Sequence, residues 1–91
     1  MFVAKVIGNV VATQKNESLV GSKLLIVKPL QIIPQQKTGG PIIVVDTIGA
    51  GIGEVVIVST GSSARNAAQS GGVVDAAVVG IIDSMEIEEV D

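Results

Sequence analysis

Runs of aliphatic residues alternate along the chain with short polar stretches rich in glycine and proline. Short apolar runs of β-branched residues bounded by turn formers are typical of strands. Five such runs predict strands over residues 2–13, 23–33, 42–47, 55–59 and 73–83. A further segment, 85–90, alternates apolar and acidic residues as a strand with one solvated face does. The hydropathy pattern therefore predicts five or six short strands.

Three features refine these strands. Gly8 interrupts the first one, which predicts a β-bulge or bend. Pro29 lacks an N–H group, so its half of the second strand should lie at a sheet edge or a bulge. The third strand is apolar without interruption, which predicts burial on both faces. In a small barrel one of those faces needs a cover outside the core, and a neighbouring subunit would supply it.

The stretch after the fourth strand predicts the one helix of the chain. The side chain of Ser62 or Ser63 can cap a short helix over 64–69, and the glycines that follow it suit a helix C-terminus. Short strands separated by turns are typical of small barrels. We therefore predict a mainly β protein: a small β-barrel of five to six strands with one short helix, in a single domain over 1–91.

Composition changes this picture by pointing to assembly. Hydrophobic residues make up 47% of the 91 residues, with 11 glycines and one phenylalanine. A domain of this size buries only about 60–65% of its unfolded surface. So many aliphatic side chains exceed what its interior can hold, and we expect a share of them at contacts between subunits. The alternative is an unusually apolar monomer.

Several classes of function are disfavoured by residue types that are missing or scarce. The chain has no cysteine and no histidine, which excludes disulfides, thiolate metal sites and the commonest general base. A cysteine-free chain also fits the cytosol. No apolar run reaches the roughly 18 residues of a membrane span. A net charge of −3 and a single aromatic residue argue against a nucleic-acid partner.

Residues 46–65 form the most unusual stretch, with three glycines at alternate positions, Gly49, Gly51 and Gly53. A dinucleotide-binding fingerprint would need its third glycine at position 54, which is Glu54, and a helix directly after it. A strand-like run follows instead. We interpret the glycines structurally, as positions that permit positive φ and allow another backbone to come close.

Catalytic and metal-binding interpretations find little support in the same stretch. Ser62 and Ser63 have no histidine or suitably spaced lysine to activate them. Carboxylates such as Asp46, Glu54 and Asp83 could bind a metal, although isolated carboxylates on strands are usually solvated or paired. We therefore predict no catalytic residue, no cofactor and no metal site, and a protein that is not an enzyme.

Arg65 is the single arginine of the chain. Its guanidinium can form a bidentate pair with a carboxylate of a neighbouring subunit. The partners considered are Asp46, Glu54, Asp75 and Asp83. The alternative is a solvated surface arginine that contributes little to stability.

Three blocks of sequence together resemble the EutN/CcmL family of bacterial microcompartment vertex proteins. They are the opening FVAKVIGNVVAT, the stretch DTIGAGIGEVVIVSTGSSAR and the late VDAAVVGIID. The family's G-A-G-x-G-E motif falls on Gly49, Ala50, Gly51, Gly53 and Glu54. Its G-S-S-A-R motif falls on Gly61, Ser62, Ser63, Ala64 and Arg65, and its late motif on Val74, Asp75, Val79, Gly80, Ile81, Ile82 and Asp83.

The resemblance implies an OB-like barrel that assembles into homopentamers. Such pentamers close the vertices of a cytoplasmic protein shell whose facets are hexameric shell proteins. It favours a metabolosome over a carboxysome. The alternative is a stand-alone OB-like barrel that binds a small molecule and oligomerises incidentally. On the first interpretation the candidate subunit interface comprises Asp46, Gly49, Ala50, Gly51, Gly53, Glu54, Ser62, Ser63, Arg65, Asp75 and Asp83.

Overall fold

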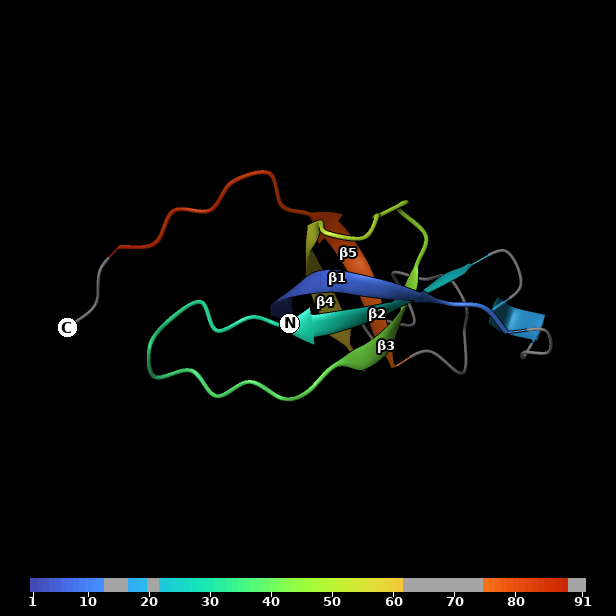
Figure 1. The fold of residues 1–91 in the computed structure, drawn as a ribbon, viewed down its shortest axis with the longest axis horizontal. Coiled ribbons are helices and arrows are strands. Elements are labelled where there is room, and N and C mark those ends of the chain that lie inside the picture. Colours follow the sequence, from blue (N-terminus) through green and yellow to red (C-terminus); the bar gives the residue numbers. More distant parts are fainter. Residues whose placement is uncertain (13–16, 20–21, 62–74, 89–91) are drawn as a thin grey trace.

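Five strands close into a barrel in this computed structural model, which describes residues 1–12, 17–19, 22–61 and 75–88 (Figure 1). The elements are β1 (Phe2–Val10), a 3-10 turn η1 (Glu17–Leu19), β2 (Lys23–Pro29), β3 (Ile42–Asp46), β4 (Val55–Thr60) and β5 (Ala76–Ile81). Around the barrel their order is β1-β2-β3-β5-β4. The predicted helix over 64–69 lies outside the described residues.

The connectivity of the barrel is that of a Greek key. β5 lies between β3 and β4; it runs parallel to β3, whereas every other neighbouring pair is antiparallel. A five-stranded Greek-key barrel is the architecture of the OB fold. The predicted mainly β, OB-like barrel is therefore confirmed.

Four of the five strands end earlier than the hydropathy pattern predicts. β1 stops at Val10, and β2 stops at Pro29, whose missing N–H cannot continue the ladder. After Pro29 the chain leaves the barrel, and Leu30 makes one backbone hydrogen bond to the Val3 carbonyl (2.9 Å). The predicted strand over 85–90 is wrong for its described part, because residues 85–88 are not in a strand. Closure of the barrel explains this, since β4 and β5 already pair on both sides.

The bulge predicted at Gly8 is confirmed. The register between β1 and β2 shifts between Val6 and Gly8, which leaves Ile7 as the extra residue. The bulge bends β1 and lets it pair with two strands, through Phe2–Lys5 with β4 and from Ala4 onward with β2. β1 is thus the strand that closes the barrel.

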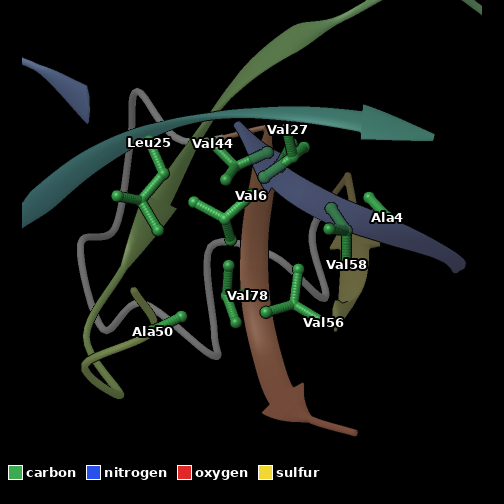
Figure 2. Close-up of a cluster of buried hydrophobic side chains, with 10 residues drawn as sticks. Ala4, Val6, Leu25, Val27, Val44, Ala50, Val56, Val58 and Val78 are labelled. Carbon is green, nitrogen blue, oxygen red and sulfur yellow. The ribbon is translucent and has the colours of Figure 1, made fainter. Parts of the chain in front are cut away.

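Small aliphatic side chains fill the interior. Valines from all five strands point toward one another with Leu25 (Figure 2). Ala50, which belongs to the loop between β3 and β4, also lies fully buried in this core. The core comprises Ala4, Val6, Leu25, Val27, Val44, Ala50, Val56, Val58, Ala76 and Val78. Compact β-branched residues suit the narrow interior, and the loop that supplies Ala50 is thereby fixed to the barrel.

Burial of β3 on both faces is only partly right. Val44, Val45 and Asp46 are buried, whereas the Ile43 side chain is 57% exposed. Val45 and Ala77 form a small second cluster on the outer side of the barrel, and Leu19 and Leu24 of the same chain pack against it. Part of the outer cover of β3 therefore comes from its own protomer rather than from a neighbour.

Candidate assembly site

The loop that joins β3 to β4, residues 47–54, is organised around the carboxylate of Asp46. This side chain is 2% exposed. It accepts backbone hydrogen bonds from Ile48 (2.8 Å), Gly49 (3.2 Å to each oxygen) and Ala50 (2.7 Å). Aspartate readily bonds the backbone a few residues ahead, and a charged acceptor strengthens such bonds. The carboxylate therefore holds the first half of the loop in one conformation.

The second half of the loop is closed by Glu54. The Gly51 N–H donates to Glu54 Oε1 (2.7 Å), and the Glu54 N–H donates to the Gly51 carbonyl (3.1 Å). Gly49 and Gly53 have φ of 103° and 93°, a region that glycine occupies without strain. Two of the alternating glycines are therefore required by backbone geometry, and the glutamate of the motif binds its own loop.

Three further bonds attach the loop to the barrel. The Gly53 N–H donates to the Val6 carbonyl (2.8 Å), and the Val6 N–H donates to the Glu54 carbonyl (2.9 Å). Lys23 Nζ donates to the Ala50 carbonyl (2.9 Å). With Ala50 in the core, the loop is fixed at both ends and in the middle. It presents Ile52, 63% exposed, and Ile48 on its outer side.

The candidate interface residues divide into three groups in the structure. Asp46 and Ala50 are buried, so they support the loop from within and their side chains are not on its surface. Gly51 is half-buried, and the exposed residues are Gly49, Gly53, Glu54, Asp75 and Asp83. Ser62, Ser63 and Arg65 lie outside the described residues. Among the carboxylates considered as partners of Arg65, the Asp46 carboxylate is thus buried and hydrogen-bonded within its own loop.

Sequence reasoning missed two residues of this site: one that bonds the loop to the barrel and one that is exposed at its surface. Lys23, at the start of β2, is 27 positions away from Ala50 in the chain. No local pattern could have linked these two residues. Ile52 stands at the variable position of the glycine motif, where its apolar character was a usable signal of a contact surface.

Ligand-binding features are sparse in the part of the chain that the structure describes. One surface hollow, of about 450 Å³, is lined by Met1, Phe2, Val3, Ile32, Gln36, Ile57, Ile82, Ser84 and Met85. Small-molecule sites combine apolar walls with convergent polar groups, and this lining has no charged side chain. The described residues contain no group of three acidic side chains able to hold a metal. Nor do they contain a helix with the length and apolarity of a membrane span.

A family model described as "Ethanolamine utilisation protein EutN/carboxysome" matches residues 1–83. The chain belongs to the EutN/CcmL family. Within it, the chain is 56% identical over 89 residues to the bacterial microcompartment shell vertex protein GrpN of Rhodospirillum rubrum (strain F11), covering 94% of this chain and 97% of GrpN.

Other relatives extend the comparison across the family. The vertex protein PduN of Salmonella typhimurium (strain LT2) is 45% identical, covering 93% of this chain and 98% of PduN. The carboxysome shell vertex protein CcmL of Synechocystis (strain PCC 6803) is 41% identical, covering 96% and 87%. A solved structure of GrpN, a pentameric microcompartment shell protein from Rhodospirillum rubrum, superimposes with a TM-score of 0.81 at 54% identity, covering 98% of this chain and all of that one.

Proposed function

We propose that this EutN/CcmL protein is a structural subunit of a bacterial microcompartment shell, that it forms a homopentamer, and that the pentamer closes a vertex. It acts by assembly and not by catalysis. The observation that carries the proposal is the match over 98% of the chain to the pentameric shell protein GrpN. The match includes the barrel and its connections, so the surfaces that build a ring have counterparts here.

Exposed aliphatic side chains support the same conclusion independently. Eight isoleucine or methionine side chains within the described structure are more than two-fifths exposed: Met1, Ile7, Ile33, Ile43, Ile48, Ile52, Met85 and Ile87. They lie on several different strands and loops. A ring closes head to tail, with one surface of each copy meeting a different surface of the next. Dispersed apolar surfaces suit such an assembly.

We infer the type of shell from the two highest identities among the relatives named above. The chain is 56% and 45% identical to GrpN and PduN, but 41% identical to the Synechocystis carboxysome protein. This order supports a cytoplasmic metabolosome-type compartment. The remaining partners in the proposal are the hexameric shell proteins that surround each vertex.

The rigid 47–54 loop is the surface that we assign first to the ring contact. Gly49, Gly51 and Gly53 have no side chains that would hold a neighbouring subunit away. Ile52 and Glu54 are exposed beside them. The small residues allow close approach, and Asp46 and Ala50 hold the loop from behind. Ser62, Ser63 and Arg65 complete the proposed interface, with Arg65 paired to an exposed carboxylate of the next copy, Glu54, Asp75 or Asp83.

Mass measurement at micromolar protomer concentration tests the function. The expected species has the mass of five chains, and a stable monomer would refute the proposal. A stable monomer that also binds a small molecule saturably would instead support the stand-alone barrel. Co-expression with hexameric shell proteins tests the vertex role: we expect closed polyhedra with this protein and elongated or leaky shells without it.

A further inference from the structure

The residues that follow β5 form an arm, here defined as residues 83–88. The arm leads away from the barrel on the same side as the connection between β2 and β3 (Figure 1). Its last link to the barrel is the bond from the Ile82 N–H to the Val55 carbonyl (2.8 Å). From 83 to 88 no residue has a hydrogen-bond or strand partner among the described residues. The arm is extended backbone that the described part of its own protomer leaves unpaired.

The side chains of the arm have a two-sided pattern. Alternate residues of an extended chain point in opposite directions. Met85 and Ile87 therefore share one side, and Glu86 and Glu88 share the other, about 7 Å apart along the chain. The apolar side chains remain 44% and 51% exposed. The arm thus offers one apolar side and one acidic side to whatever covers it.

The outer surface of β1, β2 and β3 carries apolar and basic side chains, which complement the apolar and acidic side chains of the arm. We define the β1–β3 face by Lys5, Ile26, Lys28 and Ile43, which alternate along their strands with buried core residues. Lys5 and Lys28 are register partners, as are Ile26 and Ile43. The face therefore carries an apolar pair beside a pair of lysines.

The lysine pair is unfavourable in the isolated protomer. Residues directly opposite on antiparallel strands lie only about 5 Å apart, and like charges in that position repel. Neither lysine makes an ion pair with an acidic residue of the described structure. The chain has a net charge of −3, and these two exposed, neighbouring cations are complementary in charge to the neighbouring carboxylates of Glu86 and Glu88.

We propose that the arm of one protomer lies across the β1–β3 face of the next protomer in the ring. Met85 and Ile87 pack on Ile26 and Ile43, and the lysines extend along the arm to reach Glu86 and Glu88 with their ammonium groups. Each protomer contributes its arm to one neighbour and receives the arm of its other neighbour. The contact is therefore heterologous, as a closed ring requires. The inference rests on the proposed ring and adds the segment that links its members.

Charge exchange tests this contact. The variants are Lys5→Glu with Lys28→Glu, Glu86→Lys with Glu88→Lys, and all four substitutions together. Sedimentation velocity over a dilution series measures the protomer concentration at which the ring dissociates. Each double variant should raise it about tenfold or more, and the fourfold variant should restore it to within about threefold of the parent. Raised salt should reduce these differences.

The matched control adds positive charge at exposed positions outside both the arm and the candidate interface, by Glu17→Lys with Gln35→Lys and Thr38→Lys. It makes the same change in net charge. Combined with Lys5→Glu and Lys28→Glu, the control substitutions should not restore the stability of the ring. On their own, they should not weaken the ring as Glu86→Lys with Glu88→Lys does. The inference is overturned if the fourfold variant dissociates as readily as the double variants, or if the double variants match the parent. A parent chain that forms no ring would instead refute the proposed function itself.

Crosslinking shows which barrel receives the arm. The chain has no cysteine, so Lys28→Cys combined with Glu86→Cys introduces the only two thiols. Oxidation should give covalent oligomers up to five chains in denaturing electrophoresis. Covalent species of one chain only would show that the arm folds back on its own barrel and would overturn the inference.

Discussion

Asp46 shows how one side chain can decide the shape of a functional loop. Its carboxylate is buried, and each of its oxygens accepts backbone N–H groups from the residues that follow. A buried acceptor with several donors contributes through every bond it makes, and its loss would leave those N–H groups without a partner. At the residue scale the loop is therefore organised from inside, by a group that no neighbouring subunit can reach.

Asp46→Asn should destabilise the protein while the loop keeps a side chain of the same size. The amide retains one acceptor oxygen but turns an NH₂ group toward backbone N–H donors, so we expect a loss of about 1–3 kcal/mol in the free energy of unfolding. Urea denaturation at a fixed protomer concentration measures it. Glu17→Gln, at an exposed position outside the candidate interface, is the control. Equal midpoints for the two variants would contradict the role assigned to Asp46.

Gly53→Ala should be costly for a different reason. No atom lies within 4 Å of the position of the added methyl group, so the cost comes from the φ of 93° and should be about 1–2 kcal/mol. Gly39→Ala is the matched control, because it also has open space and its backbone lies outside the left-handed region. It should be neutral or slightly stabilising. Thermal midpoints of the two variants compare them, and a Gly53→Ala variant as stable as its control would exclude strain.

At the scale of elements, the barrel depends on β1 pairing with two strands and on a core of small residues. The bulge at Ile7 lets β1 turn from β4 to β2. The side chains inside are compact and fully buried, so a single methyl group removed from them leaves a cavity that the closed sheet cannot fill.

Val56→Ala should therefore lower the free energy of unfolding by about 2 kcal/mol. Val56 is fully buried in β4, whereas Val11 is 92% exposed beyond the end of β1. Val11→Ala removes the same atoms and should change stability by less than about 0.5 kcal/mol. Denaturant titration of both variants checks the difference. Similar losses in the free energy of unfolding for the two variants would show that burial of Val56 in the barrel does not cause the loss of stability.

At the scale of the whole molecule, the protomer presents separate surfaces in different directions. The 47–54 loop is rigid and apolar at its tip, the arm is extended and amphipathic, and the β1–β3 face is apolar and basic. In the proposed role, the subunit meets two kinds of neighbour, its own copies and the hexameric shell proteins. Several distinct surfaces on one small barrel are what this role requires.

Ile52→Asp tests which neighbour meets the loop. A carboxylate at this exposed tip should raise the dissociation concentration of the ring about tenfold if the loop joins copies of this chain. Native mass spectrometry over a dilution series measures this. A ring of unchanged stability that no longer closes co-expressed shells would contradict the ring contact and place the loop against the hexameric proteins instead. Glu17→Gln, away from the loop, is the control and should leave both assemblies unchanged.

Local patterns in the sequence determined most of the barrel's strands, the bulge at Gly8 and the family, because β-branched runs, turn residues and glycine motifs act over a few neighbouring positions. They also located the stretch around Gly49 to Glu54 as the candidate site. They could not show that Asp46 points inward, because the same carboxylate on an open strand would face solvent.

Only the tertiary structure decided which distant residues meet. It placed β5 beside β3 in a closed barrel. Closure of the barrel leaves residues 85–88 without the strand partner that their alternation predicts. It brought Lys23 to Ala50 and set Lys5 opposite Lys28. Such contacts depend on strand register, which the whole barrel determines. The sequence therefore specified the strands, and barrel closure specified the surfaces available for assembly.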